Sequence, residues 1–281
     1  MNKWLRLSSF IFMLTIATAL SAFTLKDGDK DKVKDKDKAS MDCRDDWHGE
    51  RLASHCEIKE QTLPGAGAVS VDGRKNGGVS VKGWDRNEIL VRARIQTSAP
   101  SQAEADALAQ QITIETAGAK IFASGPETRR DYFWSVSYEV FVPRRTDLSL
   151  VAHNGGISIS DVQGRLEFTA VNGGVALRRV GGTVHGGTTN GGLSIELTGD
   201  RWDGEELDVK TTNGGISMSV PENYSAHLET GTVNGNLSVD FPVTVQGRIT
   251  RELAVNLGSG GPTVRAMTTN GGVRIKRGSG N

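Results

Sequence analysis

Residues 154–164 read NGGISISDVQG, and copies of this motif recur along the chain. Every copy begins with an asparagine followed by glycine, at Asn76, Asn154, Asn172, Asn190, Asn213, Asn234 and Asn270. From Asn154 onward, successive copies lie 18, 18, 23, 21 and 36 residues apart. Recurrence at intervals of this length indicates a repeat architecture in which each copy belongs to one structural unit.

Apolar residues alternate with polar or small ones on both sides of each asparagine. Three residues after it stand Ile157, Val175, Leu193, Ile216, Leu237 and Val273. Five residues after it stand Ile159, Leu177, Ile195, Met218, Val239 and Ile275. A similar alternation precedes each asparagine, where the apolar side chains become smaller toward the turn. A period of two predicts strands with one buried face.

These repeats predict an all-β fold, a parallel β-solenoid with coils of about 18–23 residues and a turn at each Asn-Gly-Gly. An antiparallel meander is the alternative, because Asn-Gly also forms hairpin turns. The recurrence of one residue class at one offset favours the stacked coils. Asparagine and glycine tolerate the positive φ of a sharp corner, and stacked asparagine side chains can hydrogen-bond along the stack. The 36-residue interval predicts two coils, with a degenerate turn at residues 259–261.

One segment departs from the strand pattern. Residues 101–112 (SQAEADALAQQI) follow a proline, and Ser101 with Glu104 matches a capping box. Ala105, Leu108 and Ile112 share one helical face. We expect a single helix that covers one end of the sheets.

The first 22 residues predict a signal peptide. Lys3 and Arg6 precede a stretch of about 16 uncharged, mostly apolar residues that ends in small ones. A membrane anchor is the alternative, but a spanning helix needs ~20 apolar residues. The expected organisation is a signal peptide (1–22), a charged linker with the two cysteines (23–61) and a repeat domain (62–281). The prediction is an exported protein, periplasmic or at the cell surface, without a membrane anchor once the signal peptide is removed.

Cys43 and Cys56 are the two cysteines of the chain. In an oxidising compartment, a pair that closes a short loop is expected to form a disulfide. Two free thiols are the first alternative. A zinc site with His48 and His55 is the second, although the order of these ligands departs from the common zinc spacings.

The chain resembles a bacterial family of β-strand-repeat proteins of unknown function that carry an adhesin label. The resemblance rests on the strand ILVRARI (89–95), the helix at 101–112, the strand YEVFVP (138–143) and the repeated NGGISISDVQG, and it covers about residues 65–276. It implies an exported β-solenoid without established catalytic residues, so no site residue is carried over.

The remaining sequence contains no strong catalytic motif. Lys+Arg and Asp+Glu both number 33, which argues against nucleic acid as a partner. No cofactor or metal site is predicted. One protruding loop, with Asp200, Trp202, Asp203 and Glu205, is a tentative site for sugar or calcium. The alternative is a solvated loop with Trp202 folded against the coil.

A column of small polar residues forms a second candidate surface, with Ser80, Ser158, Ser194, Ser217 and Ser238 all facing outward. It can serve solubility alone or meet a surface glycan or envelope protein. The sequence therefore favours a non-enzymatic envelope or surface protein, an adhesin-like scaffold or binding module. The alternatives are a carbohydrate-active β-helix enzyme and an accessory protein of envelope sensing.

Overall fold

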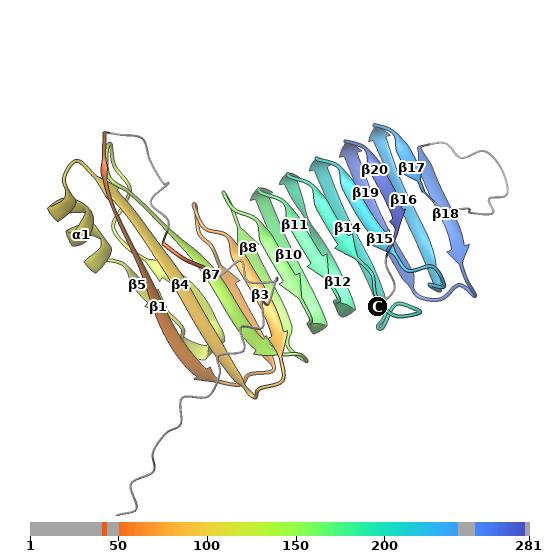
Figure 1. Cartoon of the computed structure of the whole chain (residues 1–281), viewed down its shortest axis with the longest axis horizontal. Coiled ribbons are helices and arrows are strands. Elements are labelled where there is room, and N and C mark those ends of the chain that lie inside the picture. Colours follow the sequence, from red (N-terminus) through yellow and green to blue (C-terminus); the bar gives the residue numbers. More distant parts are fainter. Residues whose placement is uncertain (1–40, 44–50, 241–250, 279–281) are drawn as a thin grey trace, which may run out of the picture. The chain divides into compact units, whose positions relative to one another are not determined.

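The computed structural model describes residues 41–43, 51–240 and 251–278 (Figure 1). The chain divides into two compact units, Met1–Ser40 and Met41–Asn281, and the account below concerns the second. The predicted signal peptide and most of the charged linker lie outside the described residues.

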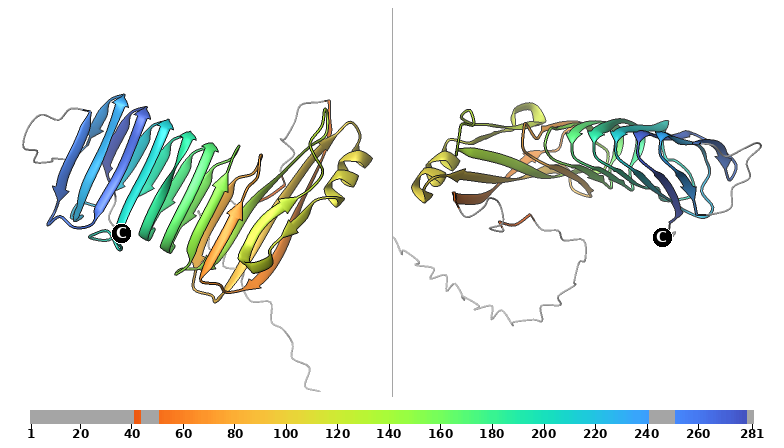
Figure 2. Two further views of the ribbon diagram at one scale, coloured as in Figure 1. Left: turned by 180° about the vertical axis from the view of Figure 1, so that it is seen from behind. Right: turned by 90° about the horizontal axis from the view of Figure 1, so that it is seen from above.

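Two ten-stranded sheets make up the fold, and Figure 2 shows them from above as two layers. Sheet A contains, in spatial order, β1 (Ala53–Pro64), β4 (Glu88–Ala99), β7 (Phe133–Pro143), β3 (Val79–Trp84), β9 (Ile157–Ser160), β11 (Val175–Arg178), β13 (Leu193–Glu196), β15 (Ile216–Val220), β20 (Val273–Arg277) and β17 (Leu237–Val239). Sheet B contains β18 (Glu252–Leu257), β16 (Ala226–Asn234), β19 (Thr263–Asn270), β14 (Glu206–Asn213), β12 (Gly181–Asn190), β10 (Gln163–Asn172), β8 (Asp147–Ala152), β2 (Ala68–Asp72), β6 (Lys120–Ser124) and β5 (Thr113–Glu115). The prediction of an all-β fold is confirmed.

The chain passes from sheet B to sheet A at each Asn-Gly-Gly turn. From β8 to β15, consecutive strands of each sheet pair in parallel and in register, so Leu148, Leu166, Val184 and Leu207 are neighbours in one row. The same holds across sheet A for Ile157, Val175, Leu193 and Ile216. All these side chains are buried between the sheets. The alternation in the sequence thus predicts the buried face.

Side-chain volumes in neighbouring coils complement one another. Phe168 is paired with Gly186 in the next strand and is only 3% exposed. A Cβ at Gly186 would lie 2.6 Å from Cδ2 of the Phe168 ring. The glycine therefore provides the space that the largest inward side chain of the coils occupies.

The asparagines of all seven motifs form one continuous row of side-chain hydrogen bonds. Each Nδ2 except that of Asn76 donates to the neighbouring Oδ1 over 2.8–3.0 Å, in the spatial order Asn234, Asn270, Asn213, Asn190, Asn172, Asn154 and Asn76. Inside this row, Thr188, Thr211, Thr232 and Thr268 are buried and donate their hydroxyls to glycine carbonyl groups. Both rows tie each corner to its neighbour.

The expectation that these corners need positive φ is wrong. No asparagine in the described residues has a positive φ, and among the first glycines of the motifs only Gly271 does, at 159°, which is extended backbone. The first glycine is required by space, since a Cβ at Gly173 would lie 2.2 Å from the carbonyl oxygen of Gly155. Left-handed residues occur instead at the opposite corner, at Asp161 (φ 60°) and Arg179 (φ 51°).

The last two coils are not stacked in chain order. Strands β19 and β20 insert between the coil of β14 and β15 and the coil of β16 and β17. Strand β18 pairs antiparallel with β16 and occupies the edge of sheet B. Within its described residues, the 36-residue interval therefore does not contain the second parallel coil that its length predicts.

The N-terminal part is also not parallel throughout. Strands β1, β4 and β7 pair antiparallel in sheet A, which corrects the prediction of parallel coils from residue 62 onward. The predicted helix is α1 (Gln102–Gln110), which packs against β1 and β4. The Ser101 hydroxyl donates to the carboxylate of Glu104 over 2.7 Å and makes no cap to the backbone, while the Ser101 backbone N–H bonds to the same carboxylate, so only the Glu104 half of the capping box forms.

Candidate functional site

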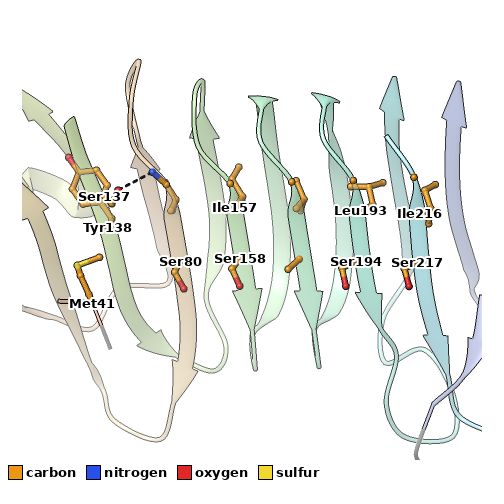
Figure 3. A pocket seen from close by; sticks show the side chains of 18 of the residues that line it. Met41, Ser80, Ser137, Tyr138, Ile157, Ser158, Leu193, Ser194, Ile216 and Ser217 are labelled. Atoms are coloured by element: carbon orange, nitrogen blue, oxygen red, sulfur yellow. Dashed lines mark hydrogen bonds between the residues drawn. The ribbon is translucent and has the colours of Figure 1, made fainter. Parts of the chain in front are cut away.

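The outer face of sheet A contains a groove of about 810 Å³ whose lining crosses the five neighbouring strands β3, β9, β11, β13 and β15 and continues to β7 and β4. Strand alternation places one small residue of each strand on this face, and the second glycine of each motif lies beside it. We call this surface the glycine–serine groove; it comprises Gly78, Gly156, Gly174, Gly192 and Gly215 with Ser80, Ser158, Ala176, Ser194 and Ser217. Figure 3 shows the four serines in one row across the strands.

Contact with the neighbouring coil constrains the first and the second glycine of each motif to different degrees. A Cβ on the first glycine would lie within 2.0–2.3 Å of a backbone oxygen, which no side chain permits. A Cβ on the second glycine would lie 3.0–3.5 Å from the nearest atom of the next coil, a tight but possible contact. These second glycines do not have positive φ either. Their φ therefore does not demand glycine, the carbonyl oxygens of the next coil leave little room for a Cβ, and the missing side chains keep the groove open.

The groove offers a row of free hydroxyl groups. Within the described part of the chain, Ser80, Ser158, Ser194 and Ser217 make no side-chain hydrogen bond. Ser80 and Ser158, and likewise Ser194 and Ser217, are separated by one strand spacing of ~4.8 Å, whereas Ala176 lies between Ser158 and Ser194. The next outward row on the same strands carries charges at Lys82, Arg178 and Glu196 and serines at Ser160 and Ser219. An uncharged polar strip thus runs beside a partly charged one.

A disulfide attaches the segment Met41–Cys43 near one end of the groove. Cys43 is bonded to Cys56 on β1, which confirms the predicted pairing. The Arg94 guanidinium donates to the carbonyl oxygen of Asp42 over 3.2 Å, and Met41 lines the groove beside Tyr138 (Figure 3). The sequence gives no signal for Met41 or Arg94 as groove residues, because only the tertiary fold brings them to this face.

Comparison with known families matches residues 70–276 to the Toastrack DUF4097 family. The chain belongs to this family. The match confirms the resemblance to a bacterial family of unknown function with an adhesin label. A comparison with curated proteins gave no match.

Several solved structures are similar to this Toastrack chain at low identity. A putative cell adhesion protein from Clostridium sporogenes is 13% identical, with 80% of this chain and 100% of that chain covered and a TM-score of 0.39. A putative adhesin from Bacteroides fragilis is 10% identical, with 79% and 97% covered and a TM-score of 0.32. A putative lipid binding protein from Parabacteroides distasonis is 9% identical, with 78% and 96% covered and a TM-score of 0.32.

The loop predicted as a tentative site is arranged around its tryptophan. Trp202 is 3% exposed, and its indole nitrogen donates to the carbonyl oxygen of Gly182 over 3.1 Å. It therefore cannot stack on a sugar. Asp203 accepts a hydrogen bond from Gln163, and Glu205 accepts one from Thr183 at 3.0 Å.

Part of this loop lines a cavity of about 400 Å³ together with Tyr224. Burial, followed by the carboxylates of Asp200 and Asp203, raises the pKa of the Tyr224 hydroxyl above its ordinary value. Among the described residues, no group of three or more His, Cys, Asp or Glu side chains could hold a metal ion. In the same part of the chain, no helix is long and apolar enough to cross a membrane.

A row of alternating charges follows the corner opposite the asparagines. Arg144 bonds to Asp85 over 2.6 Å, Arg179 bonds to Asp161 over 2.8 Å, and Arg179 also lies 3.5 Å from Glu196. The hydrogen bond from Arg179 holds the pKa of the Asp161 carboxyl below its ordinary value. The 18-residue spacing of Asp161 and Arg179 could have revealed this row in the sequence.

Proposed function

We propose that the chain is an exported, non-enzymatic envelope or surface protein whose stacked coils form a β-solenoid scaffold. In this proposal the glycine–serine groove binds an extended, uncharged polymer, a linear surface glycan. The observation that carries the proposal is the row of free serine hydroxyls across neighbouring strands. Hydroxyl groups of a sugar chain can exchange hydrogen bonds with the two serine pairs, Ser80 with Ser158 and Ser194 with Ser217, on either side of Ala176.

The composition of the groove supports binding rather than hydrolysis. Its lining contains one charged side chain, Arg94, and no carboxylate. Glycoside hydrolysis ordinarily needs two carboxyl groups on either side of the scissile bond, ~5–10 Å apart. A lining with a single cation also favours a neutral glycan over a polyanionic one, because one guanidinium cannot neutralise a row of acidic groups.

Export is supported by the sequence of residues 1–22 and by the disulfide between Cys43 and Cys56. Disulfides persist in oxidising compartments and are rare in the cytosol. Fractionation of the native host tests this part: the full chain is expected outside the cytoplasm, and a chain without residues 1–22 inside it. Recovery of the full chain in the cytoplasm would contradict export.

Affinity electrophoresis in gels that contain neutral linear polysaccharides tests the groove. The full chain is expected to be retarded by at least one of them. Ser194→Arg places a long charged side chain in the groove and is expected to abolish the retardation. Thr212→Arg adds the same charge on an exposed position of β14 in sheet B and serves as the matched control. Equal retardation of both variants would contradict the groove as the binding surface.

A further inference from the structure

A second, smaller cleft lies where the asparagine row ends. Its volume is about 360 Å³, within the range of small-molecule sites. One wall is the corner that precedes β3, with Arg74, Lys75 and Asn76. The other wall is formed by the loop of residues 124–128 and by Trp134 on β7. This cleft is separate from the glycine–serine groove, because the two share no lining residue.

Asn76 brings a free hydrogen-bond donor to the cleft. Its Oδ1 accepts from Asn154 over 3.0 Å, but within the described residues its own Nδ2 has no partner. Every other amide of the row donates to the next one, so Asn76 is the terminal donor of a chain of seven aligned amides. Hydrogen bonds in such chains polarise one another, which strengthens the terminal donor toward an acceptor.

Two cations stand beside that donor. Arg74 has a left-handed backbone, with a φ of 52°, which disfavours a side chain with a Cβ. Asp72 holds it there by accepting the Arg74 backbone N–H over 2.7 Å and by lying 3.3 Å from the guanidinium. The guanidinium also lies 4.6 Å from the centre of the Phe122 ring. Lys75, by contrast, has no ion-pair partner among the described residues.

The opposite wall is largely apolar. The indole nitrogen of Trp134 donates to the carbonyl oxygen of Pro126 over 2.8 Å, which fixes the ring in the wall. A Cβ at Gly125 would lie 3.1 Å from the ring atoms Cε2 and Cζ2. Gly125 does not have a positive φ, so its backbone conformation does not demand glycine. The missing side chain leaves the edge of the indole uncovered.

We propose that this cleft binds a small organic carboxylate with a flat apolar body. The carboxylate accepts hydrogen bonds from Asn76 and Lys75, and the body packs against Trp134 and Pro126. Arg74 is paired with Asp72, so Lys75 is the cation of the lining that has no ion-pair partner among the described residues, and Glu127 is the one acidic residue of the lining. A monoanion therefore fits the cleft better than a dianion or a cation.

Titration of the full chain with benzoate, followed by ¹⁵N–¹H NMR, tests the proposal. Saturable shifts are expected for the Asn76 side-chain amide, the Trp134 indole N–H and the Gly125 amide. Benzyl alcohol has the same ring without the charge and is expected to bind at least about tenfold more weakly, since a charge-assisted hydrogen bond is lost. No saturable shift at these groups, or equal affinity for both compounds, would overturn the proposal.

Substitutions of lysines inside and outside the cleft distinguish binding in the cleft from nonspecific attraction by positive charge. Lys75→Gln is expected to weaken benzoate binding about tenfold, whereas Lys210→Gln, an exposed position on β14, is expected to leave it unchanged. Asn76→Asp keeps the oxygen that accepts from Asn154 but replaces the free donor by a negative charge, and is expected to abolish binding. Equal effects of Lys75→Gln and Lys210→Gln would show nonspecific attraction and refute the site.

Discussion

The coils from β8 to β15 and the last two coils share one residue pattern, but only the first group stacks in the order of the chain. In the first group each coil stacks on the one before it in the chain. In the second group the C-terminal coil lies between its predecessors, so the row through Leu207 runs to Val264 and then to Leu228. All three side chains are buried and of similar size. The repeated columns therefore define how coils align, but not the order in which they stack.

Strand β18 provides the physical reason for the exchanged order. It pairs antiparallel with β16 and covers the outer edge of that strand. A short turn with Gly258 (φ 51°) and Gly260 (φ 77°) then reverses the chain. The one edge of β16 that remains for β19 is the inner one, next to β14.

The largest expected effect comes from removal of residues 263–281, which deletes β19 and β20. The deletion removes four buried apolar side chains, Val264, Ala266, Val273 and Ile275, and costs about 5 kcal/mol of unfolding free energy. Hydrogen exchange is expected to show lost protection in β16 and β18 and retained protection in β8 to β13, because coils contact mainly their neighbours. Full protection of β16 would mean that it restacks on β14, and that the coil order is not determined by β18.

Phe168→Ala tests the consecutive coils. The substitution is expected to cost about 3–5 kcal/mol, since it removes a buried ring and leaves a cavity beside Gly186. Urea denaturation measures the cost, and hydrogen exchange measures its spread. Loss of protection is expected in β8, β10 and β12 first. Uniform loss along both sheets would instead indicate a single cooperative unit.

Substitutions in the asparagine row compare the consecutive coils with the last ones and are expected to have smaller effects on stability. Asn172 lies inside the row and makes two amide hydrogen bonds, whereas Asn234 lies at the end and makes one. Asn172→Ala is expected to cost about 1–2 kcal/mol and Asn234→Ala about half as much, measured by chemical denaturation. Equal costs would show that the position in the row is unimportant.

The smallest expected effect concerns Asp161 at the opposite corner. The pKa of its carboxyl in the folded protein is lowered by the hydrogen bond from Arg179, so it lies below the unfolded value near 3.8. The ion pair therefore contributes stability above about pH 4, and this contribution is lost as the pH falls through the folded pKa. Asp161→Asn is expected to cost less than about 1 kcal/mol at pH 7 and to flatten the stability profile between pH 2 and 4. An unchanged profile would contradict a role for the pair.

The sequence pattern alone predicted the features that depend on residues close together in the chain or on repeats that align in register. The alternation around Asn172 predicts that Val175 and Leu177 are buried, and the helix at Gln102–Gln110 follows from the apolar spacing of residues 101–112. The pairing of Cys43 with Cys56 follows from their proximity in the chain. In each case one strand, one helix or one short loop determines the result.

Only the tertiary structure decided the features that depend on distant backbone. The insertion of β19 beside β14 depends on β18, and the antiparallel pairing of β1 with β4 depends on how the N-terminal strands close sheet A. The first glycines are required by the close approach of the neighbouring coil, and the second ones leave open a groove beside which the disulfide and Arg94 hold Met41. A sequence pattern records which residues share a face. It does not specify which strand edge a later strand will pair with, because equivalent edges offer the same backbone hydrogen-bonding groups and the same row of apolar side chains.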